Sequence, residues 1–130
     1  LRIGIHSDVE VTDQHEPRPR LVSQAFCSAL PVRYAAALVP PKHWARFATL
    51  ILEAAYEATM WAAVLNARRT GSNVVLLTRL GGGAFGNDAY WIDVAMRRAF
   101  QLTLAFDLDV RLVSVGTPSR EILSLAADFG

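Results

Sequence analysis

Residues 74–88 read VVLLTRLGGGAFGND, and this stretch decides the predicted fold. Four apolar residues open it, as in a strand buried within a parallel sheet. Four glycines then fall within six positions, and residues 89–106 continue with strong helix formers. A strand that passes through a glycine-rich turn into a helix is typical of α/β domains.

A long helix is predicted before this stretch. Residues 42–69 contain neither Gly nor Pro, and their polar side chains recur at three- and four-residue spacing in one narrow stripe (Arg46, Thr49, Glu53 and Glu57). We expect neighbouring elements to cover most of this apolar helix, and Gly71 to end it. Because Glu53 and Glu57 interrupt the apolar residues, the segment is a poor membrane span and no membrane is expected as a partner.

The remaining elements complete an alternating order. Residues 3–11 alternate apolar and polar positions, which indicates a strand with one buried face. Interior strands are predicted within residues 21–29 and 110–115, and Thr117-Pro118 suits the start of a last helix. This order predicts a single α/β domain over residues 1–130, a three-layer α/β/α sandwich with a mostly parallel sheet.

The glycine-rich turn is the strongest functional signal. Gly81, Gly82 and Gly83 carry no Cβ that would block a close approach to the backbone, and their N–H groups can converge on an anion. The helix that follows, capped by Asn87 or Asp88, adds the positive end of its dipole. A tight turn alone is the competing interpretation, but such a turn usually needs only one or two glycines. We therefore predict a site for a phosphate or diphosphate.

Two common phosphate-binding motifs do not fit. Gly81, Gly83 and Gly86 satisfy G-x-G-x-x-G, but the next strand ends without the carboxylate that holds the ribose of a dinucleotide. A nucleoside triphosphate loop needs Gly-Lys-Ser/Thr, whereas Asn87 and Asp88 follow Gly86. A Rossmann-like dinucleotide site therefore stays only as a weaker alternative.

The stretch over residues 74–88 resembles the second ligand loop of macrodomains, in particular the poly(ADP-ribose) glycohydrolase branch with its Gly-Ala-Phe-Gly core, here Gly83-Ala84-Phe85-Gly86. Residues 24–31, QAFCSALP, are similar to segments of uncharacterised relatives of that branch. The resemblance implies that the chain is the C-terminal part of a macrodomain that binds ADP-ribose. The implied ligand contacts are the loop residues Gly81, Gly82, Gly83, Ala84, Phe85, Gly86 and Asn87. The N–H groups of residues 82–86 would hold the diphosphate, and Phe85 would pack against the distal ribose.

The resemblance implies an ADP-ribosyl or poly(ADP-ribose) glycohydrolase, with ADP-ribose or an ADP-ribosylated protein as partner. That branch carries a first loop with paired glutamates, which is missing here, so no catalytic residue is assigned. Glu53 and Glu57 share one helix surface and are expected to face solvent or Arg46. A chain that starts at Leu1 is interpreted as a fragment whose acidic loop lies upstream. A non-catalytic reader of ADP-ribose is the alternative.

Composition sets the remaining expectations. Thirteen basic and twelve acidic residues give a formal charge of +1 without any charge run, so no direct nucleic-acid partner is expected. His6, His15 and His43 lack metal-ligand spacing, and neither a metal nor a cofactor is expected. Cys27 is the single cysteine, so no internal disulfide can form. The compartment is left open between a reducing intracellular one and secretion as an effector delivered to one.

Overall fold

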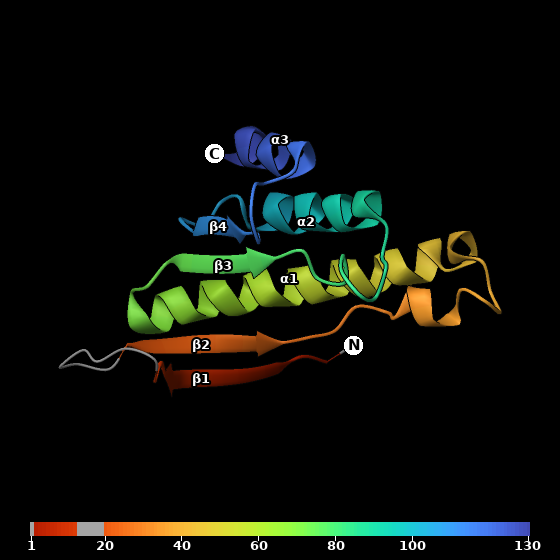
Figure 1. Ribbon diagram of the computed structural model, residues 1–130. Coiled ribbons are helices and arrows are strands. Elements are labelled where there is room, and N and C mark those ends of the chain that lie inside the picture. Colours follow the sequence, from red (N-terminus) through yellow and green to blue (C-terminus); the bar gives the residue numbers. More distant parts are fainter. Residues whose placement is uncertain (1, 13–19) are drawn as a thin grey trace.

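The computed structural model describes residues 2–12 and 20–130, which form a mixed α/β fold (Figure 1). In chain order the elements are β1 (Gly4–Glu10), β2 (Leu21–Phe26), the 3-10 turns η1 (Val32–Ala35) and η2 (Pro41–His43), α1 (Ala45–Thr70), β3 (Val74–Thr78), α2 (Ala89–Thr103), β4 (Asp109–Val113) and α3 (Arg120–Phe129). His15 lies outside the described residues.

The helix ends follow local capping chemistry. Gly71 ends α1 in the left-handed conformation (φ 80°), and its N–H donates to Ala67 O, which confirms the predicted glycine stop. Asp88, the second of the two predicted candidates, caps α2 by accepting from the Tyr90 N–H at 2.8 Å. The prediction that the last helix starts at Thr117-Pro118 was wrong. Ser119 is extended there, and its hydroxyl accepts from the Ile122 N–H, so α3 starts two residues after Pro118.

The strands form two separate pairs rather than one mostly parallel sheet. β3 and β4 are parallel, in register from Val74 opposite Asp109 to Thr78 opposite Val113, and α2 provides the crossover that a parallel pair requires. β1 and β2 are antiparallel, in register from Gly4 opposite Phe26 to Glu10 opposite Leu21 with one irregular step. The prediction of parallel pairing therefore holds for β3 and β4 alone.

The helices α1, α2 and α3 pack on one face of the β3–β4 pair. Val75 and Leu77 of β3 are buried, whereas Val74 and Leu76 on the opposite face are exposed. The buried face meets side chains from all three helices (Leu52 and Met60 of α1, Ile92 and Met96 of α2, and Leu125 of α3). The described residues thus form two layers, and a layer over Val74 and Leu76 is not among them. The three-layer part of the predicted sandwich is therefore not seen.

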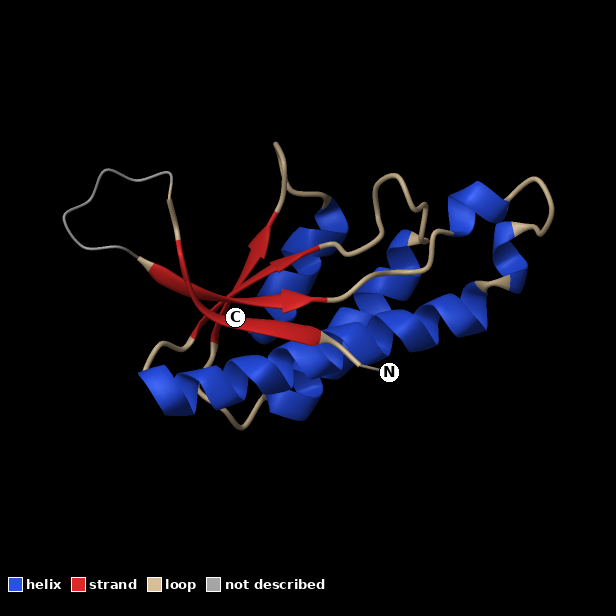
Figure 2. Cartoon of the chain, turned by 90° about the horizontal axis from the view of Figure 1, so that it is seen from below, coloured by secondary structure: helices blue, strands red, loops and turns tan. Residues whose placement is uncertain are grey.

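Burial corrects two further expectations. β2 was predicted as an interior strand, but every residue of β2 is exposed, and within the described residues β2 pairs with β1 alone. α1 was expected to be covered on most sides, yet Phe47, Leu50 and Leu65 are exposed. Figure 2 shows the strands along one side of α1, which leaves part of the helix without a neighbour. By length and composition alone α1 is long and apolar enough to cross a membrane, contrary to the expectation drawn from Glu53 and Glu57, although core helices of soluble proteins can be equally long and apolar.

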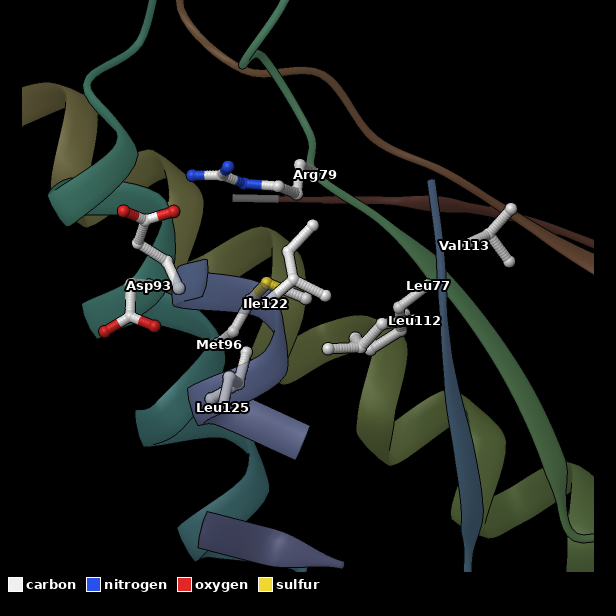
Figure 3. Close-up of a pocket in the computed structure, with 9 residues that line it drawn as sticks. Leu77, Arg79, Asp93, Met96, Leu112, Val113, Ile122 and Leu125 are labelled. Atoms are coloured by element: carbon white, nitrogen blue, oxygen red, sulfur yellow. The ribbon is translucent and has the colours of Figure 1, made fainter. Parts of the chain in front are cut away.

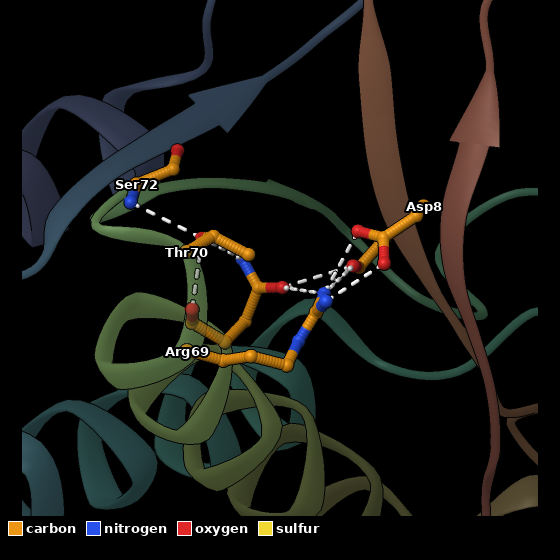
Figure 4. A network of polar contacts seen from close by, with 6 residues as sticks. Asp8, Arg69, Thr70 and Ser72 are labelled. Carbon is orange, nitrogen blue, oxygen red and sulfur yellow. Dashed lines mark hydrogen bonds and ion pairs between the residues drawn. The ribbon is translucent and has the colours of Figure 1, made fainter.

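A polar network joins the β1–β2 hairpin to the end of α1 (Figure 4). Arg69 donates two hydrogen bonds to the Asp8 carboxylate at 2.7 and 2.9 Å, and a third to Asn66. The hydrogen bond from Arg69 lowers the pKa of the Asp8 carboxyl. Asp8 has a positive φ of 56° at the irregular step of β1 between His6 and Val9. The Asp8 carboxylate thereby joins β1 to the end of α1.

Candidate functional site

The glycine-rich loop connects the end of β3 to the start of α2. It leaves the carboxyl edge of the parallel pair, where ligands of open α/β sheets bind. The predicted site residues 81–87 all belong to this single loop. Their surroundings differ, and the difference separates the residues that shape the loop from those that face outward.

Two of the glycines are required by the fold. Gly81 (φ 78°) and Gly86 (φ 68°) both adopt the left-handed conformation that L side chains rarely enter. A Cβ on Gly81 would stand 2.4 Å from the Ala29 Cβ, and one on Gly86 would stand 2.9 Å from the Arg33 Cβ. The loop is therefore closed on the side that faces residues 29–33. For these two positions the tight-turn interpretation is sufficient.

Asn87 pins the loop to the rest of the protein. Its side chain is only 5% exposed, and its Nδ2 donates to Leu30 O at 2.8 Å and to Gly81 O at 3.3 Å. Its backbone N–H also donates to Gly81 O at 3.0 Å. No donor among the described residues reaches its buried Oδ1. Asn87 is thus a clamp inside the protein rather than the helix cap.

The outer part of the loop is open. Gly82, Gly83 and Ala84 are exposed, and a Cβ on Gly83 would meet no atom within 4 Å. The Gly82 and Gly86 N–H groups are used within the loop, by Arg79 O and Gly83 O. Within residues 2–12 and 20–130, no hydrogen-bond acceptor pairs with the N–H groups of residues 83–85. Three of the five predicted donors are therefore available to a ligand.

Phe85 lies between the core and the surface. It is partly buried against the core cluster, and its ring meets the Tyr34 ring edge-on with 5.9 Å between centroids. Its carbonyl oxygen accepts from the Arg33 N–H at 2.9 Å. Phe85 therefore anchors the loop, and it joins the loop to η1.

Tyr56 of α1 braces the entry to the loop. Its hydroxyl donates to Thr78 O at 2.9 Å and accepts from the Leu80 N–H at 2.8 Å, just where β3 ends. These bonds satisfy two backbone groups that the strand ladder no longer reaches. Burial raises the pKa of Tyr56 to about 12. The helix thus sets the direction in which the chain enters Gly81.

Tyr56 predicts how stability depends on pH. Above pH 10 the unfolded chain releases the phenolic proton while the folded chain retains it up to about pH 12. Stability from this group is therefore complete below pH 10, and about 3 kcal/mol is lost as the pH rises to about 12. Tyr56→Phe should remove this loss, and should cost about 1–3 kcal/mol at pH 8 because the Leu80 N–H loses its acceptor.

Urea unfolding of wild type and Tyr56→Phe at pH 8, 10 and 11 measures both effects. Tyr90→Phe, which removes an exposed hydroxyl near the same loop, is the matched control. Equal alkaline loss in wild type and Tyr56→Phe would show that Tyr56 is not buried as described.

Two of the cavities lie at the two ends of the β3–β4 pair rather than in the glycine loop. The first encloses about 10 Å³, room for about one water molecule, under the carboxyl ends of β3 and β4 (Figure 3). Arg79 and Asp93 line it together with the apolar side chains of Leu77, Met96 and Leu125. The second is an open hollow of about 380 Å³ at the opposite edge, between the end of α1 and the loop after α2. The glycine loop lines neither of them.

The carboxylates considered at the sequence level are already engaged. Glu57 accepts a hydrogen bond from Arg98 of α2, not from Arg46, so the pair with Glu53 faces α2. Asp88 caps α2. The described part of the loop thus offers a ligand backbone N–H donors but no carboxylate that is free of hydrogen bonds within the chain.

The structure adds residues that the sequence patterns had not assigned. Residues 29–33 lie against the loop, although about 50 positions separate them in the chain. Residues 24–31 had been noted for a resemblance, but no contact with the loop could be predicted from them.

No family model, curated protein or solved structure matches this chain.

Proposed function

We propose that this chain binds ADP-ribose on the outer face of its glycine loop, as the C-terminal part of a macrodomain of the poly(ADP-ribose) glycohydrolase-like branch. The observation that carries the proposal is Gly83. Neither a positive φ nor a neighbouring atom requires glycine there, since a Cβ would point into open space. A glycine that the fold does not need favours a close approach from outside the chain.

The donors at the loop suit a diphosphate. The N–H groups of residues 83–85 are unpaired within the described chain, and the amino end of α2 follows three residues later. Phosphate oxygens accept hydrogen bonds from such backbone groups. In this proposal Gly82, Gly83, Ala84 and Phe85 contact the ligand, whereas Gly81, Gly86 and Asn87 hold the loop in shape.

Two roles follow for a protein that binds ADP-ribose in this way. In a hydrolase, water attacks the anomeric carbon of the distal ribose, and the bond to the modified protein breaks with help from a carboxylate. In a reader, the bound group is only recognised. Glu57 and Asp88 are already hydrogen-bonded within the chain. The loop residues by themselves therefore support binding of ADP-ribose. Hydrolysis additionally needs a carboxylate that the described loop does not supply.

Calorimetry with ADP-ribose and with NAD tests the proposal. We expect ADP-ribose to bind at least about tenfold more tightly than NAD, because a macrodomain site would be built around the unsubstituted distal ribose. Preference for NAD would instead support the Rossmann-like alternative. No heat with either ligand, from a chain shown to be folded by circular dichroism, would reject ADP-ribose binding.

A further inference from the structure

The turn η1 and the residues just before it pack against the glycine loop. The Arg33 N–H donates to Phe85 O at 2.9 Å, and Asn87 Nδ2 donates to Leu30 O at 2.8 Å. The Tyr34 ring meets the Phe85 ring edge-on. These three contacts fasten residues 30–34 to the loop.

The Arg33 side chain lies directly over Gly86. A Cβ on Gly86 would stand 2.9 Å from Arg33 Cβ and 3.1 Å from Arg33 Nε. The Nε atom of the guanidinium group therefore lies beside the backbone of Gly86, next to the residues whose N–H groups are unpaired. The residue as a whole is exposed.

Arg33 has no carboxylate partner among the described residues, in contrast to four other arginines. Arg69, Arg97, Arg98 and Arg111 each bind an aspartate or glutamate. Across residues 2–12 and 20–130, no hydrogen bond or ion pair engages the Arg33 guanidinium. Arg79, the other arginine beside the loop, turns instead toward α2, where it donates to Ala89 O.

We infer that Arg33 is the charged contact for the diphosphate, and that it completes the site built by the loop N–H groups. This inference rests on the proposed function. A planar guanidinium carries paired donors that match phosphate oxygens, and a partner-free one gives up no ion pair on binding. η1 therefore supplies the positive charge that the glycine loop, with its backbone donors alone, does not contain.

Arg33→Gln tests the inference against Arg68→Gln, which removes the same charge from an exposed arginine at the far end of α1. Two probes are titrated by calorimetry at low and high salt: ADP-ribose, and inorganic pyrophosphate, which has the diphosphate without ribose or base. We expect Arg33→Gln to bind both probes about tenfold or more weakly than wild type, with a shallower salt dependence. Arg68→Gln should match wild type, and thermal unfolding should show both variants folded.

The outcomes separate the two proposals. Equal affinities for Arg33→Gln and Arg68→Gln, in a protein that binds ADP-ribose, overturn the role of Arg33 and leave the proposed function standing. Binding of pyrophosphate without ADP-ribose rejects the proposed function, and Arg33 is then judged on pyrophosphate alone. A wild type that binds neither probe overturns both.

Discussion

Gly83→Val is expected to abolish ADP-ribose binding, with a loss of at least about a hundredfold in affinity and little change in stability. The loss follows from position, because the isopropyl group would project into the open space above the unpaired N–H groups of residues 83–85. Phosphate oxygens bind such donors at about 2.9 Å, and a branched side chain excludes that approach. The fold should tolerate the change, since a Cβ there meets no atom within 4 Å.

Ala105→Val is the matched control for Gly83→Val. It adds a similar side chain at an exposed position after α2, away from the carboxyl edge of the strands. Calorimetry measures the affinity of each variant, and thermal unfolding measures its stability. An affinity for ADP-ribose that Gly83→Val leaves unchanged would contradict a site on the outer face of the loop.

Gly81→Ala is expected to have the opposite profile, a large loss of stability. Alanine at φ 78° costs about 1–2 kcal/mol, because the left-handed conformation crowds its Cβ. The Cβ would also stand 2.4 Å from Ala29 Cβ and 2.6 Å from Asn87 Nδ2. Overpacking of this kind costs a further 1–3 kcal/mol or so, for a total of about 2–5 kcal/mol.

Gly71→Ala separates the two contributions. Gly71 has nearly the same φ, 80°, but a Cβ there would meet nothing within 4 Å. It should therefore lose only the conformational part, about 1–2 kcal/mol. Urea unfolding of both variants gives the comparison. If Gly81→Ala were no less stable than Gly71→Ala, the packing of residues 29–31 on the loop would be wrong as described.

The glycines of the loop show how much of its structure could be predicted from the sequence. Four glycines in six positions favoured an anion site over a tight turn, on the ground that a turn needs only one or two. The structure assigns two of them, Gly81 and Gly86, to the turn. What remains beyond the needs of the turn is chiefly Gly83, and the functional proposal now rests on it.

The polar residues around the loop could be anticipated only in part. Asp88 was a candidate helix cap, since capping depends on residues two or three positions apart. Asn87 instead bonds to Leu30, and Arg33 lies over Gly86. Neither contact has a periodic or spacing signal, because the partners are more than 50 positions apart in the chain.

What the sequence determined by itself was local. It predicted the long helix that ends at Gly71, the strand that runs into a glycine turn and a helix, and the parallel pairing that the α2 crossover allows. These features could be predicted because propensity, capping and chain connection act between residues close together in the chain. Tertiary structure alone decided that the helices share one face of β3 and β4, that β2 stays exposed, and that η1 lies against the loop. Those outcomes depend on packing between distant segments, which no local pattern records.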